Sequence, residues 1–199
     1  KIGDMSIVEY IMDHYASHGV KEFVLCLGHL GEKIKDYFSD KKEKYNITLV
    51  DTGINSSKTQ RLLKIKDLLG EVFLVSYGDD LSNVDISKLV EFHKKEGKIA
   101  TLVSVRLPNP YGTLELNEFE PALVSKFREK PLMKDWINGG YFVFNKSIFE
   151  YLDENSELEN DTLKNLSEKK QLCAYRHPGF WKSINTLKDS IELNEMYSE

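Results

Sequence analysis

Residues 72–80, Val-Phe-Leu-Val-Ser-Tyr-Gly-Asp-Asp, combine an apolar run with a polar turn. The apolar part is continuous rather than alternating, which predicts a strand over 72–77 that is buried on both faces. Strands of this kind are typical of parallel sheets covered by helices. The stretch therefore favours an α/β fold in which Gly78, Asp79 and Asp80 follow the carboxyl end of a strand.

The alternation of strand and helix continues outward from this stretch in both directions. It implies a three-layer fold with a mixed, mostly parallel central sheet, and the shorter strands after Pro108 predict some antiparallel pairing. No repeat or linker divides the chain, so we predict a single domain over 1–199. We expect helices over 6–18, 32–38, 58–69, 85–96, 147–152, 161–169 and 186–197, and strands over 23–27, 47–50, 72–77, 99–105, 113–116, 122–128 and 137–145.

Composition excludes several classes of protein. The 199 residues carry 27 Lys plus Arg against 32 Asp plus Glu, a net charge of −5, and 11% aromatic residues, which predicts a packed core and disfavours nucleic acid as a partner. No apolar run could cross a bilayer and the first residues do not resemble a signal peptide, so we predict a cytoplasmic protein without a membrane partner. Cys26 and Cys173 are interpreted as reduced core residues.

Two carboxylates, Asp79 and Asp80, lie where open α/β sheets bind ligands, just beyond the carboxyl end of a strand. Carboxylate oxygens suit Mg²⁺, which is commonly shared between one or two carboxylates and substrate phosphates. A solvated turn that uses Gly and Asp for backbone reasons is the alternative.

Other segments could bind a ligand, although each has a simpler interpretation. The cations of 126–131 could hold a phosphate or merely end a strand. The paired glycines of 138–140 could admit a ligand to the backbone or form a bulge. The aromatic residues of 177–181 could line a pocket or fill a core edge. No Gly-rich phosphate loop occurs in the chain.

Taken in order, these motifs resemble those of the sugar-phosphate nucleotidylyltransferases, in particular the glucose-1-phosphate cytidylyltransferase branch. The resemblance implies the Rossmann-like fold of nucleotide-diphospho-sugar transferases, dependence on Mg²⁺, and assembly as a homo-oligomer. It also implies attack of a sugar 1-phosphate, in particular glucose 1-phosphate, on CTP. The products are pyrophosphate and a CDP-sugar, which is used for polysaccharide synthesis. The stretches that carry it include RLLKIKDLL (61–69), FLVSYGDDLSNVDI (73–86), VSKFREKP (124–131), WINGGYFVFN (136–145) and HPGFWKSINTLKD (177–189).

The resemblance also implies roles for individual residues. Asp79 and Lys130 match the catalytic pair, in which the aspartate binds Mg²⁺ and orients the nucleotide while the lysine holds the sugar phosphate. Glu129 matches a glutamate that contacts sugar hydroxyls. The remaining matches are Thr59, Gln60, Arg61 and Gly78 for the nucleotide, and Tyr111, Gly112, Asn138, Gly139 and Trp181 for the sugar pocket.

The chain departs from the family in its phosphate-binding region. The family opens with a strand, a Gly-rich loop and a Lys-Pro-Lys segment that cradle the triphosphate, and Lys1 aligns just after them. We therefore expect these 199 residues to lack that loop, to bind CTP poorly and to show almost no turnover. The region after Tyr37 is also shorter than in the family, which suggests a missing internal loop near 40–43.

Two substitutions concern the metal and the nucleotide. Asn185 stands where the family has a second Mg²⁺-binding aspartate, so we expect weaker metal binding there; a surface Asn before a helix cap is the alternative. Thr59 and Gln60 stand where the family has two glycines before Arg61, which leaves the nucleotide open. The same chemistry with another nucleotide or phosphorylated acceptor, and a catalytically silent relative that binds nucleotide or sugar, are the alternative functions.

Overall fold

A four-stranded mixed sheet forms the centre of the protein in the computed structural model, which describes residues 1–41 and 44–196. β8 runs antiparallel to β3 and to β5, and β9 runs parallel to β5, so three of the four strands share one direction. The predicted mixed sheet is confirmed. Its order is β3 (Val72–Ser76), β8 (Ile137–Asn145), β5 (Ala100–Val105) and β9 (Leu172–Arg176).

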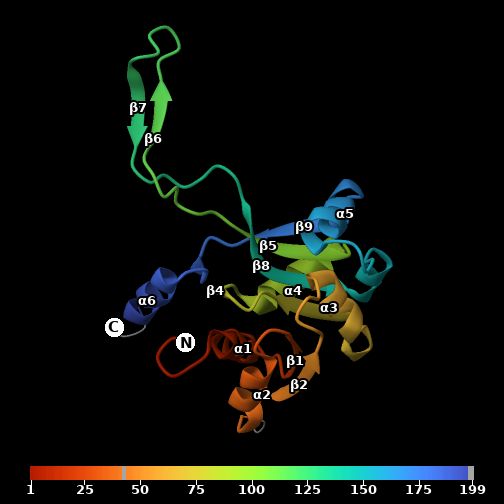
Figure 1. Cartoon of the computed structure of the whole chain (residues 1–199). Coiled ribbons are helices and arrows are strands. Elements are labelled where there is room, and N and C mark those ends of the chain that lie inside the picture. Colours follow the sequence, from red (N-terminus) through yellow and green to blue (C-terminus); the bar gives the residue numbers. More distant parts are fainter. Residues whose placement is uncertain (42–43, 197–199) are drawn as a thin grey trace.

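Three further strand pairs lie outside this sheet. β1 and β2 pair in parallel, β4 and β10 pair antiparallel beside the end of β3, and β6 and β7 form a hairpin that projects away from the sheet (Figure 1). Their bounds are β1 (Glu22–Leu27), β2 (Asn46–Asp51), β4 (Asp80–Ser82), β10 (Trp181–Ser183), β6 (Thr113–Leu116) and β7 (Val124–Arg128).

Local capping explains where several helices begin. The Ser6 hydroxyl accepts the Glu9 N–H at the start of α1, and Ser57 and Gln60 form a reciprocal capping box at the start of α3. The α-helices are α1 (Ile7–Ser17), α2 (Gly31–Ser39), α3 (Lys58–Ile65), α4 (Ile86–Glu96), α5 (Lys164–Glu168) and α6 (Leu187–Met196), with 3₁₀-helices η1 (Lys66–Leu68) and η2 (Lys146–Glu150) and a π-helix, η3 (Leu158–Leu163).

The sequence predictions were wrong in several elements. The helix expected over 58–69 divides into α3 and η1, that over 147–152 is the 3₁₀-helix η2, and that over 161–169 is η3 followed by α5. The predictions missed β9, although residues 172–175 form an apolar run. β3 was expected to be buried on both faces, but it is the other edge strand of the sheet and is mostly half-buried. The predictions also missed β4 and β10, which have three residues each. The expected end of the last helix, Tyr197, lies outside the described residues.

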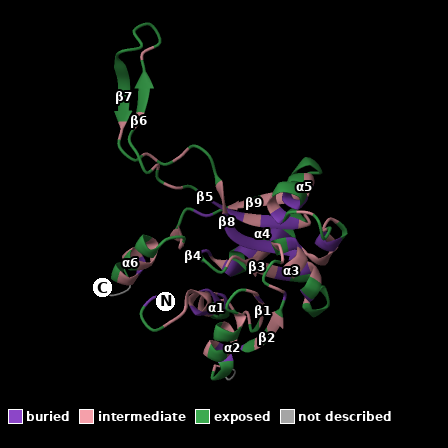
Figure 2. Ribbon diagram, viewed as in Figure 1, coloured by how far each residue is buried: buried purple, intermediate pink, exposed green. Residues whose placement is uncertain are grey.

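β8 carries the centre of the core on both of its faces. Tyr141, Phe142, Val143 and Phe144 are fully buried, and successive side chains of a strand point to opposite faces. Tyr141 and Val143 pack in a cluster with residues of α1, α4 and α6, whereas Phe142 and Phe144 pack with residues of α3, η2 and α5. Figure 2 shows this buried layer between half-buried and exposed helices. Each buried phenylalanine contributes roughly 1.5–3 kcal/mol, and the arrangement confirms the predicted three layers.

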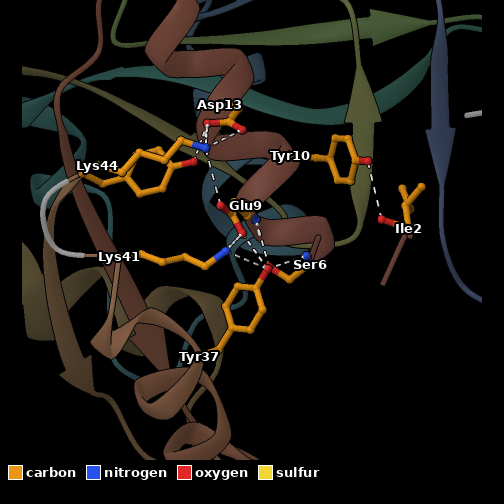
Figure 3. Close-up of polar contacts among 9 residues, drawn as sticks. Ile2, Ser6, Glu9, Tyr10, Asp13, Tyr37, Lys41 and Lys44 are labelled. Carbon is orange, nitrogen blue, oxygen red and sulfur yellow. Dashed lines mark hydrogen bonds and ion pairs between the residues drawn. The ribbon is translucent and has the colours of Figure 1, made fainter. Parts of the chain in front are cut away.

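A buried carboxylate joins α1 to α2 and the segment that follows it (Figure 3). Glu9 is 3% exposed, and its carboxylate accepts hydrogen bonds from the Tyr37 hydroxyl at 2.5 Å and from Lys41. Lys44 lies 3.5 Å from the other Glu9 oxygen and 2.9 Å from Asp13. Because a buried charge without partners is costly, this network holds the segment against α1. The position near 40–43 at which an internal loop was expected to be missing includes Lys42 and Glu43, which lie outside the described residues.

Candidate active site

The turn after β3 brings Asp79 beside β10. The N–H of Ile184 donates to the backbone carbonyl of Asp79 at 2.8 Å, and Asp80 is the cross-strand partner of Ser183. The Asp79 side chain is exposed, whereas Asp80 is 4% exposed. Of the two carboxylates considered from sequence, Asp79 is therefore the one open to a ligand. Gly78 is also exposed, and the nearest atom to a Cβ there would be 3.8 Å away, on Val8.

Asp80 is embedded in the fold. Burial raises the pKa of its carboxyl above the ordinary value, and the nearby Asp79 charge acts in the same direction; a hydrogen bond with Ser183 and the charge of Lys58 oppose this only in part. The backbone carbonyl of Asp80 accepts the Tyr141 hydroxyl at 2.9 Å. These contacts indicate that Asp80 shapes the turn that presents Asp79.

The paired glycines of β8 form a bulge, as the simpler interpretation of the sequence had it. Asn138 pairs with Ser104 and Phe142 with Leu102, so three residues of β8 lie opposite the single residue Val103. The Trp181 indole N–H donates to the Gly139 carbonyl at 2.7 Å, and the Asn138 side-chain oxygen accepts the Gly140 N–H at 3.0 Å. The bulge thus brings together Asn138, Gly139 and Trp181, three residues predicted for the sugar pocket.

Asn185 follows β10 and is exposed. Its side-chain N–H donates to the Ser183 hydroxyl at 3.0 Å, and its backbone N–H donates to Asp189 at 3.2 Å. Asp189 also accepts the Thr186 N–H at 2.8 Å, as the predicted capping box requires. Asn185 therefore lies on the same turn as the backbone contact to Asp79, and its side-chain carbonyl is not used by any hydrogen bond found in residues 1–41 and 44–196.

Thr59 and Gln60, the residues that replace two glycines, are both occupied by the fold. Thr59 is fully buried, and its hydroxyl has no hydrogen-bond partner among the described residues. The Gln60 side chain accepts the Ser57 N–H at 3.1 Å and donates to the Glu154 carbonyl at 3.0 Å. The Gln60 side chain stabilises the start of α3, whereas the Thr59 side chain is buried there without a hydrogen bond.

Arg61 connects the carboxyl ends of β1 and β2. Its guanidinium donates to the Leu27 carbonyl at 3.0 Å and to the Thr52 hydroxyl at 2.5 Å. Leu27 is the last residue of β1, and Thr52 directly follows β2. Because arginine has five donors in a rigid fork, these contacts leave N–H groups of Arg61 available at the ligand-binding edge of the sheet.

The second half of the predicted site lies at the base of the β6–β7 hairpin, just before β6 and just after β7. Tyr111, Gly112, Glu129 and Lys130 are exposed, and Figure 1 shows the hairpin standing away from the sheet. No hydrogen bond or ion pair in the described ranges joins them to the turn at Asp79. The structure thus brings Asp79 together with the residues of β8 and β10, but not with Lys130.

Comparison with known proteins decides the family. The model of the nucleotidyl transferase family matches residues 1–199. The chain belongs to this family. This nucleotidyl transferase is 36% identical to a probable glucose-1-phosphate cytidylyltransferase of Bacillus subtilis over 222 residues, which cover 100% of this chain and 86% of the relative. It is 33% identical to the glucose-1-phosphate cytidylyltransferase of Salmonella typhi over 225 residues, with the same coverage.

The fold of this nucleotidyl transferase also has counterparts among solved structures. HddC from Yersinia pseudotuberculosis superposes with a TM-score of 0.72 and 18% identity, covering 97% of this chain and 88% of that protein. The expected nucleotide-diphospho-sugar transferase fold is confirmed. No helix in the described part of the nucleotidyl transferase is both long and apolar enough to span a membrane.

Sequence reasoning missed three side chains beside the predicted sugar pocket. Tyr77, Lys58 and Glu159 contact one another directly, although they come from different elements. Tyr77 directly precedes the Gly-Asp-Asp turn, which is the one signal that could have indicated it. Lys58 and Glu159 are 101 residues apart, and no motif relates them.

Proposed function

We propose that this nucleotidyl transferase forms CDP-glucose and pyrophosphate from CTP and glucose 1-phosphate. An oxygen of the sugar phosphate attacks the α-phosphorus of CTP, and the bond from that phosphorus to the oxygen bridging to the β-phosphorus breaks. Identities of 33–36% with two glucose-1-phosphate cytidylyltransferases over the whole chain support this choice. The observation that carries it is the exposed Asp79 at the carboxyl end of β3, beside the bulge at Gly139.

Asp79 and Asn185 would hold Mg²⁺ in this reaction. No three His, Cys, Asp or Glu side chains gather to hold a metal in the part of the chain that the structure describes. Mg²⁺ needs fewer protein ligands, because it keeps several waters and shares substrate phosphates. The free carboxylate of Asp79 and the side-chain carbonyl of Asn185 are oxygen donors that fit it. When bound, Mg²⁺ neutralises charge on the phosphates.

The protein residues bind and orient the two substrates. Lys130 holds the sugar phosphate as a point charge, and Glu129 accepts hydrogen bonds from sugar hydroxyls. Such positioning is the main contribution that a protein can make to phosphoryl chemistry. Other proposed sugar contacts are Tyr111, Gly112, Asn138, Gly139 and Trp181, and the proposed nucleotide contacts are Arg61 and Gly78. The predicted contacts through Thr59 and Gln60 are not retained, because the Thr59 side chain is fully buried and the Gln60 side chain is engaged at the start of α3.

A second candidate is a catalytically silent relative that binds nucleotide or sugar. The neutral side chain of Asn185 favours it, because an amide attracts a divalent cation less than a carboxylate does. The buried side chain of Thr59 and the hydrogen-bonded side chain of Gln60 favour a third possibility, the same reaction with another nucleotide or phosphorylated acceptor.

Release of pyrophosphate tests these candidates. The protein is incubated with Mg²⁺, each of CTP, UTP, GTP and dTTP, and either glucose 1-phosphate or mannose 1-phosphate. We expect the highest release with CTP and glucose 1-phosphate, at the low rate expected of these 199 residues. Release should be lost in Asp79→Asn and unchanged in Asp36→Asn, which alters an exposed carboxylate on α2. Nucleotide binding without release in any combination would favour the silent relative.

The biological setting is also proposed. We infer that the product supplies polysaccharide synthesis in the cytoplasm and that the protein forms a homo-oligomer. Light scattering coupled to size-exclusion chromatography would measure the oligomeric state, and a monomeric mass would contradict it.

A further inference from the structure

The Tyr77 side chain joins three elements beside the predicted sugar pocket. Its hydroxyl donates to the carboxylate of Glu159 in η3 and accepts from the side-chain N–H of Asn138 in β8, with 3.4 Å between the donor and acceptor atoms. The ammonium of Lys58, the first residue of α3, lies 4.2 Å from the centre of the Tyr77 ring. Tyr77 therefore contacts both the sugar side and the nucleotide side of the site.

Glu159 is the second hydrogen-bond partner of the Tyr77 hydroxyl, besides Asn138. One carboxylate oxygen of Glu159 accepts hydrogen bonds from both Tyr77 and Lys58. Burial alone would raise the pKa of Glu159, but the hydrogen bonds from Lys58 and Tyr77 outweigh it and the pKa is lowered. The carboxylate is thus ionised at neutral pH, and hydrogen bonds to an ionised acceptor are about twice as strong as neutral ones. π-Helices such as η3 are frequent at functional sites.

Asn138 receives its orientation from two contacts. Its side-chain oxygen accepts the Gly140 N–H at 3.0 Å, and one of its amide hydrogens points to Tyr77. A primary amide has two N–H donors, so the second donor remains for a ligand. Because the amide is planar, fixing its oxygen and one hydrogen also fixes the direction of the second hydrogen.

We propose that Glu159 is a positioning residue for sugar binding: it fixes Tyr77, and Tyr77 fixes the amide of Asn138 toward a sugar hydroxyl. This inference rests on the proposed function, in which Asn138 contacts the sugar. Glu159 acts only through Tyr77, and the ion pair with Lys58 ties the same group to the start of α3.

A mutant cycle with glucose 1-phosphate as the probe tests the order of these contacts. Calorimetry measures its dissociation constant for Glu159→Ala, Tyr77→Phe, Asn138→Ala and the pairwise combinations. We expect each single variant to weaken binding by about tenfold. A double variant should bind glucose 1-phosphate almost as well as either single variant, because both substitutions act through the amide of Asn138. Glu159→Gln keeps an oxygen acceptor for the Tyr77 hydroxyl and should retain most of the affinity.

The controls separate this role from a purely structural one. Glu157→Ala changes an exposed glutamate two residues away and should leave binding unchanged, and CTP affinity should stay constant in every variant. The positioning role would be overturned if the increases in dissociation constant multiplied in the double variants. It would also be overturned if the variants lost affinity for CTP and for glucose 1-phosphate equally. If Glu159→Ala does not fold, Glu159→Asp takes its place in the cycle, because the shorter side chain withdraws the carboxylate from the Tyr77 hydroxyl. A wild-type protein that binds glucose 1-phosphate but releases no pyrophosphate overturns the proposed reaction alone.

Discussion

Gly140 passes so close to Asp80 that a Cβ atom at residue 140 would lie 2.0 Å from the Asp80 carboxylate oxygen Oδ2. Gly140 also has a φ of +73°, a conformation that favours glycine. The buried carboxylate and the strand bulge therefore fit together only when residue 140 has no side chain. This fit sets the turn that carries Asp79.

Replacing Gly140 by alanine should destabilise the protein strongly. The positive φ costs about 1 kcal/mol or more, and the overlap with Asp80 adds roughly 1–3 kcal/mol. Urea unfolding measures the loss. Gly97→Ala is the matched control, because Gly97 has a φ of +61° but no atom within 4 Å of an added Cβ. An equal loss of unfolding free energy in the two variants would mean that the contact with Asp80 does not contribute to stability.

Asn185→Asp should strengthen Mg²⁺ binding. The substitution adds a negative charge to the turn beside Asp79 with almost no change in side-chain size. Titration of pyrophosphate release against Mg²⁺ should reach half-maximum at a concentration several-fold lower than in the wild type. An unchanged midpoint would reject Asn185 as a metal ligand and support its interpretation as a surface residue before a helix cap.

Trp181→Phe should weaken binding of the sugar phosphate. The variant removes the 2.7 Å hydrogen bond that holds the Gly139 carbonyl, which is worth about 1 kcal/mol. The KM for glucose 1-phosphate should rise about fivefold, with kcat nearly unchanged. Trp136→Phe is the control, because Trp136 is 41% exposed and its ring contacts the guanidinium groups of Arg106 and Arg176, at 5.7 Å and 5.5 Å from the ring centre. A similar rise in both variants would count against a specific role for Trp181.

Acid should weaken the contact between α1 and α2. Burial raises the pKa of Glu9, but hydrogen bonds from Lys41 and Tyr37 and the charges of Lys41 and Lys44 bring it below the ordinary value of 4.5. A carboxyl with a lowered pKa contributes stability above its unfolded pKa, near 4.5, and this contribution is lost as the pH falls through the lowered value.

Glu9→Gln tests this dependence. The variant should lose about 1–2 kcal/mol of stability near neutral pH and show a flatter decline below about pH 4.5. Thermal unfolding between pH 3 and pH 7 provides the measurement, with the exposed Glu168→Gln as control. A decline as steep as that of the wild type would assign the acid sensitivity to other carboxylates.

Local signals explain which parts of the fold were predictable. The continuous apolar run at 72–77 predicted β3, and Ser6 with Glu9 predicted the start of α1. The edge strand β9 was missed although residues 172–175 are apolar, and its place in the sheet depends on pairing with β5, which lies far away in the chain. β4 and β10 have three residues each and are defined by their pairing with each other rather than by local periodicity.

The same division holds for the candidate site. Asp79, Gly139 and Trp181 were predicted from motifs, and the structure places them near the turn after β3 and the bulge of β8, while their roles stay predictions. The contact of Lys58 with Glu159 joins residues far apart in the chain, so neither segment indicates it alone. Lys130 was also predicted from a motif. The motif does not indicate the direction of the β6–β7 hairpin, because that direction depends on the few hydrogen bonds at the base of the hairpin.

The base of that hairpin has a mechanical consequence. Below the proposed sugar-phosphate residues, Pro108 and Leu132 form an isolated bridge, and above them Thr113 pairs with Arg128. Tyr111, Gly112, Glu129 and Lys130 thus lie between two paired positions of the same hairpin. Any rotation about this stem would carry them as a unit and preserve their mutual spacing. The approach of the sugar phosphate to the nucleotide would then depend on a single hinge rather than on separate loop adjustments.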